Sequence, residues 1–75
     1  MRTEALALLD RLLDRLDEPR RAVFVLAEIE QLPAPAIAEA LDTNVNTVYS
    51  RLRSARQQID QALARERARE RWRPR

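Results

Sequence analysis

The sequence predicts an all-α fold, a compact four-helix domain over residues 1–64 with a C-terminal helix-turn-helix. Three observations predict it. Apolar residues recur at spacings of three and four along successive segments, which is the helical period. Prolines and short polar turns separate these segments. Residues 35–56 read as a short helix, a tight turn and a longer helix that begins with small polar residues and continues into arginines, the layout of a helix-turn-helix.

The first predicted helix spans residues 3–16 and carries a wide leucine stripe. Leucines recur at spacings of three and four at Leu6, Leu9, Leu13 and Leu16. Leu8 and Leu12 widen this stripe. A stripe of this kind is typical of a helix that faces a core. The alternative is that part of this face stays open for a partner helix.

The second predicted helix spans about residues 19–30 and follows Asp17-Glu18-Pro19. Proline and acids suit a first helical turn, because that turn has free N–H groups and a positive dipole end. Its inner stripe is Ala22, Val25, Leu26 and Ile29, broadened by Val23, Phe24 and Ala27. We expect this helix to be buried on more than one side.

The third predicted helix is short, about residues 34–41, and points Ile37, Ala38 and Leu41 inward. A left-handed residue usually follows such a helix, and glycine usually supplies it. The chain contains no glycine, so Asp42 is expected to take this conformation. Asn44 is the expected N-cap of the next helix.

The fourth predicted helix runs from Val45 to about Ala64 or beyond. Its apolar stripe is Val48, Leu52, Ala55, Ile59 and Ala62 or Leu63. Residues 65–75 have no such stripe and form an arginine-rich tail, which we expect to fray or be disordered. Trp72 in this tail either stacks on a partner or belongs to a disordered end.

Composition excludes several classes of function. The chain has 75 residues, no cysteine and no histidine, so it lacks the usual nucleophile–base pairs and zinc ligands. We expect no enzyme, no cofactor and no metal site. No apolar run approaches the roughly 20 residues that span a bilayer, and the N-terminus lacks a signal-peptide layout. We therefore expect a cytoplasmic protein without membrane insertion.

Charge divides the chain into two halves. Residues 1–42 hold five arginines and nine acids, whereas residues 43–75 hold nine arginines and three acids. Such asymmetry indicates a polyanion as the partner of the basic half and a different partner for the other half. The basic half begins where the fourth helix begins.

The polar face of that fourth helix has the chemistry of a DNA-reading helix. Asparagine, threonine, serine and tyrosine bond bases or phosphates, and arginine pairs with guanine or phosphate. The residues of this face are Asn46, Thr47, Tyr49, Ser50, Arg51, Arg53 and Arg56. The helix start, capped by Asn44, also attracts phosphate. The alternatives are an ordinary solvated face and, for Arg51, a brace to acids on a neighbouring helix.

Three segments resemble region 4 of bacterial sigma factors, most closely the extracytoplasmic-function (ECF) group. They are LDEPRRAVFVL at residues 16–26, IAEAL at residues 37–41 and NTVYSRLRSAR at residues 46–56. The resemblance covers about residues 5–63. It implies a domain that recognises the −35 promoter element, docks on the β flap of RNA polymerase and in many members binds an anti-sigma factor.

The resemblance also implies site residues. Those that fall where the family contacts DNA are Asn44, Val45, Thr47, Tyr49, Ser50, Arg51 and Arg53. Those in the helices that meet the flap are Leu8, Leu9, Leu12, Leu13, Leu16 and Val23. The departures from the family pattern are Ala36 for glutamate, Asp42 and Asn46 for glycines, and Ser54 for arginine. They leave the preferred −35 sequence open.

Two other functions compete with this one. The DNA-binding domain of a LuxR-type regulator has a similar four-helix plan, but a threonine-histidine pair usually stands where this chain has Ser50 and Arg51. The second competing function is that of a region-4-like module that acts mainly through protein contacts, with the β flap or an anti-sigma factor. The resemblance lacks the region that melts and reads the −10 element, so the chain is expected to be either a fragment of a sigma factor or a protein of region 4 alone.

Overall fold

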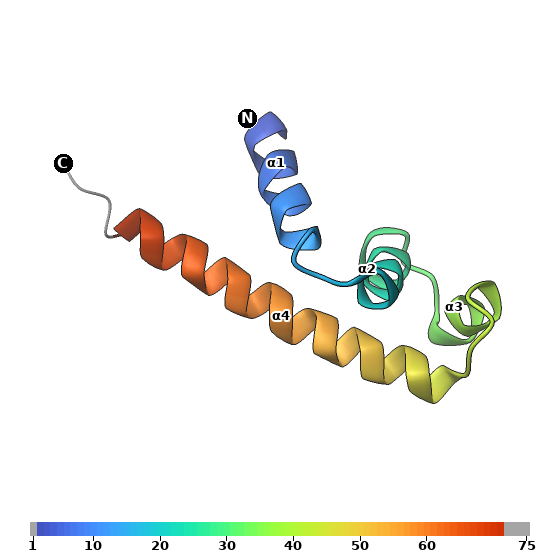
Figure 1. The fold of residues 1–75 in the computed structure, drawn as a ribbon. Coiled ribbons are helices and arrows are strands. Elements are labelled where there is room, and N and C mark those ends of the chain that lie inside the picture. The colour runs from blue at the N-terminus through green and yellow to red at the C-terminus, as the bar shows by residue number, and fades with distance from the viewer. Residues whose placement is uncertain (1, 72–75) are drawn as a thin grey trace.

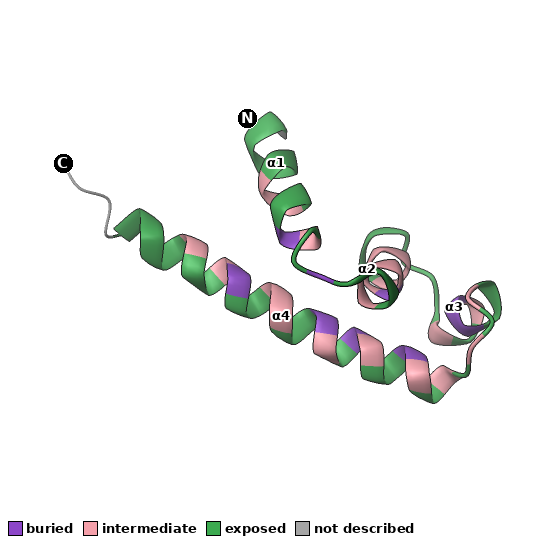
Figure 2. Ribbon diagram, in the orientation of Figure 1, coloured by how far each residue is buried: buried purple, intermediate pink, exposed green. Residues whose placement is uncertain are grey.

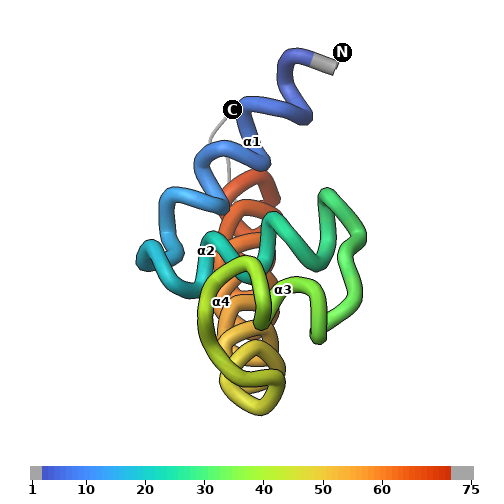
Figure 3. Tube along the Cα trace, turned by 90° about the vertical axis from the view of Figure 1, so that its right-hand side faces the viewer, coloured from blue at the N-terminus to red at the C-terminus, as the bar shows by residue number. Residues whose placement is uncertain are grey.

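Four helices make up the fold (Figure 1), and the computed structural model describes residues 2–71. They are α1 (Arg2–Leu13), α2 (Glu18–Phe24), α3 (Ala34–Ala40) and α4 (Val45–Arg71), with a π-helical segment η1 (Val25–Ile29) that continues α2. The described residues contain no strand, so the all-α prediction is confirmed. The first three helices lie on one side of α4, and α2 crosses it (Figure 3).

Helix α1 ends three residues earlier than the sequence predicted. The amide of Arg15 bonds the carbonyl of Leu12 at 3.1 Å, and that of Leu16 bonds the carbonyl of Leu13 at 3.0 Å. These i→i−3 bonds tighten the chain into a turn. The turn places Leu16 in the interior, where its side chain is 2% exposed.

Helix α2 begins at a side-chain cap. Asp17 has an extended backbone, and one carboxylate oxygen accepts the N–H of Arg20 at 3.1 Å. The other oxygen pairs with the guanidinium of the same arginine. One acid thus satisfies a free N–H of the first turn and fixes the arginine side chain.

The π-helical segment changes which residues of the second helix are buried. The amide of Glu30 bonds the carbonyl of Val25, an i→i−5 bond of 2.9 Å. A π turn takes more residues than an α turn, so the apolar stripe shifts out of register. Ile29 was predicted to face inward and is 49% exposed, whereas Val23 is 0% exposed. The prediction for Ile29 was wrong for this reason.

Two of the described residues adopt left-handed conformations without being glycine. Asp42, with a φ of 54°, confirms the prediction for the turn after α3, and the amides of Asp42 and Thr43 bond the carbonyls of Glu39 and Ala38. This is a Schellman ending. Gln31, with a φ of 62°, follows η1 in the same way, and the next amide bonds the carbonyl of Leu26 at 2.9 Å.

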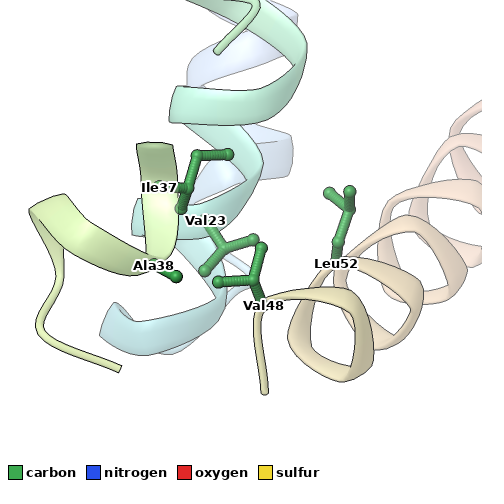
Figure 4. Packing of buried hydrophobic residues seen from close by; sticks show 5 residues of the cluster. All are labelled: Val23, Ile37, Ala38, Val48 and Leu52. Carbon is green, nitrogen blue, oxygen red and sulfur yellow. The ribbon is translucent and has the colours of Figure 1, made fainter. Parts of the chain in front are cut away.

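The core lies where α2, α3 and α4 meet (Figure 4). Its buried cluster is Val23, Ile37, Ala38, Val48 and Leu52. Burial of a valine, leucine or isoleucine side chain stabilises a fold by about 1.5–3 kcal/mol, so this small cluster carries much of the stability. The other buried residues are Leu12 of α1, Leu16 in the turn that follows it, and Ala55 and Ala62 of α4.

Helix α4 extends beyond the packed part of the molecule. Its buried residues end at Ala62, but the helix continues to Arg71 (Figure 2). The molecule is therefore elongated, with extents of 50 × 23 × 16 Å. The sequence placed a domain boundary after residue 64 with a frayed tail at residues 65–75. That tail stays a prediction, and Trp72 lies outside the described residues.

Candidate nucleic-acid interface

The helix-turn-helix consists of α3, the turn at residues 41–44 and the first turns of α4. Asn44 caps α4 as predicted, since its Oδ1 accepts the N–H of Thr47 at 2.7 Å. The amide of Val48 bonds the carbonyl of Asn44 at 3.1 Å. The remaining free N–H groups of the first turn and the helix dipole favour an anion at this end of α4.

The predicted DNA-binding residues divide by exposure. Those that are exposed are Asn44, Asn46, Tyr49, Ser50, Arg53 and Arg56; those that are half-buried are Val45, Thr47 and Arg51. Val45 packs partly against the core cluster. The largest exposed apolar surface among them belongs to Tyr49, which is 55% exposed. A polar and cationic face therefore stands on a helix whose opposite side is anchored in the core.

A shallow hollow of about 320 Å³ follows this face along α4. The residues that line it are Tyr49, Leu52, Arg53, Arg56, Gln57 and Asp60. Positions three and four apart share one face of a helix, so the tyrosine and both arginines of this hollow project in one direction. An aromatic ring and two guanidinium groups can meet bases and phosphates together.

Arg56 is held by an acid from another element. Its Nε donates to Oε2 of Glu28 at 2.6 Å, and its Nη2 lies 2.5 Å from the same oxygen. Arg51 and Arg53 form no ion pair within residues 2–71. The alternative of Arg51 as a brace to acids therefore finds no partner in the described part of the chain.

A second contact fixes α2 against α4. The Nε of Arg20 donates to Oγ of Ser54 at 2.7 Å, and Asp17 holds the same guanidinium. Sequence reasoning missed this contact and the ion pair of Glu28 with Arg56. Their partners lie 34 and 28 residues apart, and no local pattern indicates which charges meet across such distances.

The predicted partner-binding residues also divide. Leu8, Leu9 and Leu13 are half-buried, but Leu12, Leu16 and Val23 are buried in the chain itself. The last three side chains belong to the core and are not accessible to a partner in this structure. Of the half-buried leucines, Leu8 lines a hollow of about 570 Å³ between α1 and α4. The other lining residues are Glu4, Ala5, Ala7, Arg11, Leu63, Glu66, Arg67 and Glu70.

A further apolar surface lies on the second helix, where the sequence predicted core. Ala22, Val25 and Leu26 line a hollow of about 360 Å³ together with Glu18 and Arg21. Beyond it, Ile29 and Leu32 are exposed. The sequence does contain an indication of this surface. The predicted second helix has apolar residues on two faces, and only one of those faces can pack against the core.

Other classes of site find no support within residues 2–71. No group of acids, histidines or cysteines there could hold a metal ion. No helix in that range has the length and apolar character that crossing a membrane requires.

Comparison with known proteins gives one result. A family model described as Sigma-70, region 4 matches residues 6–59, a range that contains most of α1, all of α2 and α3, and the first half of α4. No curated protein and no solved structure matches the chain significantly. The match favours a sigma-type domain over a LuxR-type one.

Proposed function

The chain belongs to the Sigma-70 region 4 family, and we propose that it reads the −35 promoter element as a domain of the ECF group. Region 4 of sigma factors is a non-enzymatic, DNA-binding helix-turn-helix domain of transcription initiation. It generally binds −35 promoter DNA and RNA polymerase. The assignment to the ECF group rests on the string NTVYSRLRSAR at residues 46–56.

The observation that carries this proposal is the geometry of the start of α4. Its N-terminus is capped by Asn44. Val45 and Val48 anchor it in the core, and its exposed side chains are polar, aromatic or cationic. We assign phosphate contacts to this helix end and base-edge or phosphate contacts to the side chains of the first three turns. The proposed contact residues are Asn44, Val45, Asn46, Thr47, Tyr49, Ser50, Arg51 and Arg53.

The test is duplex binding by a variant that lacks both unpaired arginines. Arg51→Ala/Arg53→Ala removes two cations, so we expect weaker binding and a salt dependence whose slope falls by about 0.9 for each lost phosphate contact. Fluorescence anisotropy with a labelled duplex over a range of salt measures both. The control, Arg65→Ala/Arg67→Ala, removes the same charge from α4 outside the helix-turn-helix. Equal losses in the two variants would assign the effect to net charge rather than to this site.

We propose that the second partner, RNA polymerase, is bound through its β flap at a surface formed by the acidic half of the chain and the C-terminal part of α4. The hollow between α1 and α4 and the apolar hollow on α2 support this proposal. Leu8 lines the first hollow, Leu9 and Leu13 are half-buried on the same helix, and Val25 and Leu26 line the second hollow. Both hollows combine apolar side chains with acids and arginines at their rims, as protein interfaces do.

Calorimetry with a purified β-flap fragment tests this second contact. Leu8→Glu and Val25→Glu place charges in the two hollows, and we expect either change to weaken flap binding while DNA binding persists. Asp60→Ala changes a residue of the other hollow on α4, the one lined by Tyr49, Arg53 and Arg56. It is the matched control and leaves flap binding unchanged. A folded wild-type chain that binds DNA but no flap fragment would favour a region 4 committed to another partner. An anti-sigma factor and a cytoplasmic location remain predictions.

A further inference from the structure

The polar face of α4 that we propose reads DNA carries three arginines, Arg51, Arg53 and Arg56; we call it the reading face. Within residues 2–71, Glu28 is the one acid that forms an ion pair with an arginine of this face. Both Nε and Nη2 of Arg56 approach its Oε2, at 2.6 and 2.5 Å. The carboxylate comes from η1, and the guanidinium comes from the fourth turn of α4. Because the partners are 28 residues apart, the pair exists only in the folded domain.

Arg56 occupies a place from which it can reach DNA. It lines the same hollow as Tyr49 and Arg53, on the same helical face, about 10 Å further along the axis than the tyrosine. A helix whose first turns contact base edges brings cations of its later turns towards the phosphates that flank the groove. The side chain is 57% exposed, so a phosphate can approach it from solvent.

We propose that Glu28, by pairing with Arg56, keeps this arginine from contacting DNA phosphates and thereby lowers the affinity of α4 for DNA. The inference rests on the proposed function and concerns the regulation of that same site. The Nε–H of Arg56 is already donated to the carboxylate, and the negative charge beside the guanidinium weakens its attraction for a phosphate. Arg51 and Arg53 have no such counter-charge among residues 2–71, so they supply the cationic contacts while Arg56 stays paired with Glu28.

The test is a double-mutant cycle measured as DNA affinity against salt. Glu28→Gln keeps the shape of the side chain and removes its charge, so we expect about three- to ten-fold tighter binding at low salt and a slope steeper by about 0.9, the value of one phosphate contact. In the wild-type background Arg56→Ala changes affinity little. In the Glu28→Gln background it removes the whole gain, which is the non-additivity that a coupled pair produces.

The matched control is Glu30→Gln, which removes an exposed acid from the residue that follows η1. It raises the net charge equally, so an equal gain in affinity would overturn the inference. A gain from Glu28→Gln that persists after Arg56→Ala would also overturn it, and so would weaker binding by a Glu28→Gln chain that circular dichroism shows to be folded.

The outcome also separates this inference from the proposed function. The probe is a labelled, mixed-sequence duplex, because non-specific binding already reports the phosphate contacts. A folded wild-type chain that binds no duplex would refute the proposed DNA-reading role. A wild-type chain that binds, with Arg51→Ala/Arg53→Ala weakened and Glu28→Gln unchanged, would refute only the role of Glu28.

Discussion

The two halves of α4 share one helix but differ in what holds them. The packed half, residues 45–62, buries Val48, Leu52, Ala55 and Ala62 against the other helices. The overhang, residues 63–71, has no buried residue and carries four arginines and two glutamates. Leu63, Glu66, Arg67 and Glu70 line the hollow that faces α1, and Glu66 lies 3.7 Å from Arg11 and 3.9 Å from Arg69.

This difference shows that arginine content alone does not identify a nucleic-acid interface. Both halves of α4 are rich in arginine, but only the packed half fixes its cations relative to a capped helix start and an aromatic ring. Side chains on a rigid, buried helix lose less conformational freedom when they bind than those on an unsupported one. We therefore place specific DNA contacts in the packed half and assign to the overhang, at most, non-specific attraction.

The largest expected effect comes from the same substitution in each half. Leu52→Ala opens a cavity in the core cluster, so we expect the free energy of unfolding to fall by about 2–5 kcal/mol. Leu63→Ala, at a half-buried position at the start of the overhang, is expected to cost about 1 kcal/mol. Urea denaturation followed by circular dichroism measures both. Equal losses would mean that the overhang contributes to the fold as much as the packed half.

The difference between the halves was largely predictable from periodicity. The stripe of Val48, Leu52, Ala55 and Ala62 is buried as expected, because residues at helical spacing must face one side. The cap at Asn44 and the left-handed Asp42 were also predicted, since both depend on side chains and backbone preferences within a few residues. The stripe did not predict where α4 ends. Helical residues that are not buried need no apolar periodicity, so the sequence does not mark them as helical.

The second helix marks the limit of such reasoning. Its sequence has two apolar faces, and the choice between them depends on the π turn at Val25–Ile29. Leu26 and Ala27 of that turn pack against the core cluster, whereas Ile29, which the sequence assigned to the core, is exposed. The site has the same limit: the exposed polar residues of α4 were predicted individually, but the counter-charge that Glu28 supplies to Arg56 depends on tertiary structure.

A smaller effect is expected at the boundary between the turn and the packed half. Asn44→Ala removes the acceptor for the N–H of Thr47, which costs about 0.5–2 kcal/mol in stability. For a domain of this size a loss of 1 kcal/mol lowers the melting temperature by about 4–8 °C. Thermal unfolding measures it. Asn46→Ala is the control, because this exposed asparagine forms no side-chain bond within residues 2–71, and a loss as large as that of Asn44→Ala would contradict the role of the cap.

The smallest effect is expected in the overhang itself. Glu66→Gln weakens its ion pairs with Arg11 and Arg69. Glu66 is half-buried but both arginines are exposed, and pairs with solvated partners contribute about 0–1 kcal/mol. We therefore expect the melting temperature to change little at physiological salt and the small difference to disappear at high salt, since screening removes what remains of the attraction. A large loss of stability that salt does not reduce would show that the overhang is packed against α1 more firmly than these distances indicate. The contrast between the two halves would then fail, and with it the reason for placing specific DNA contacts only in the packed half.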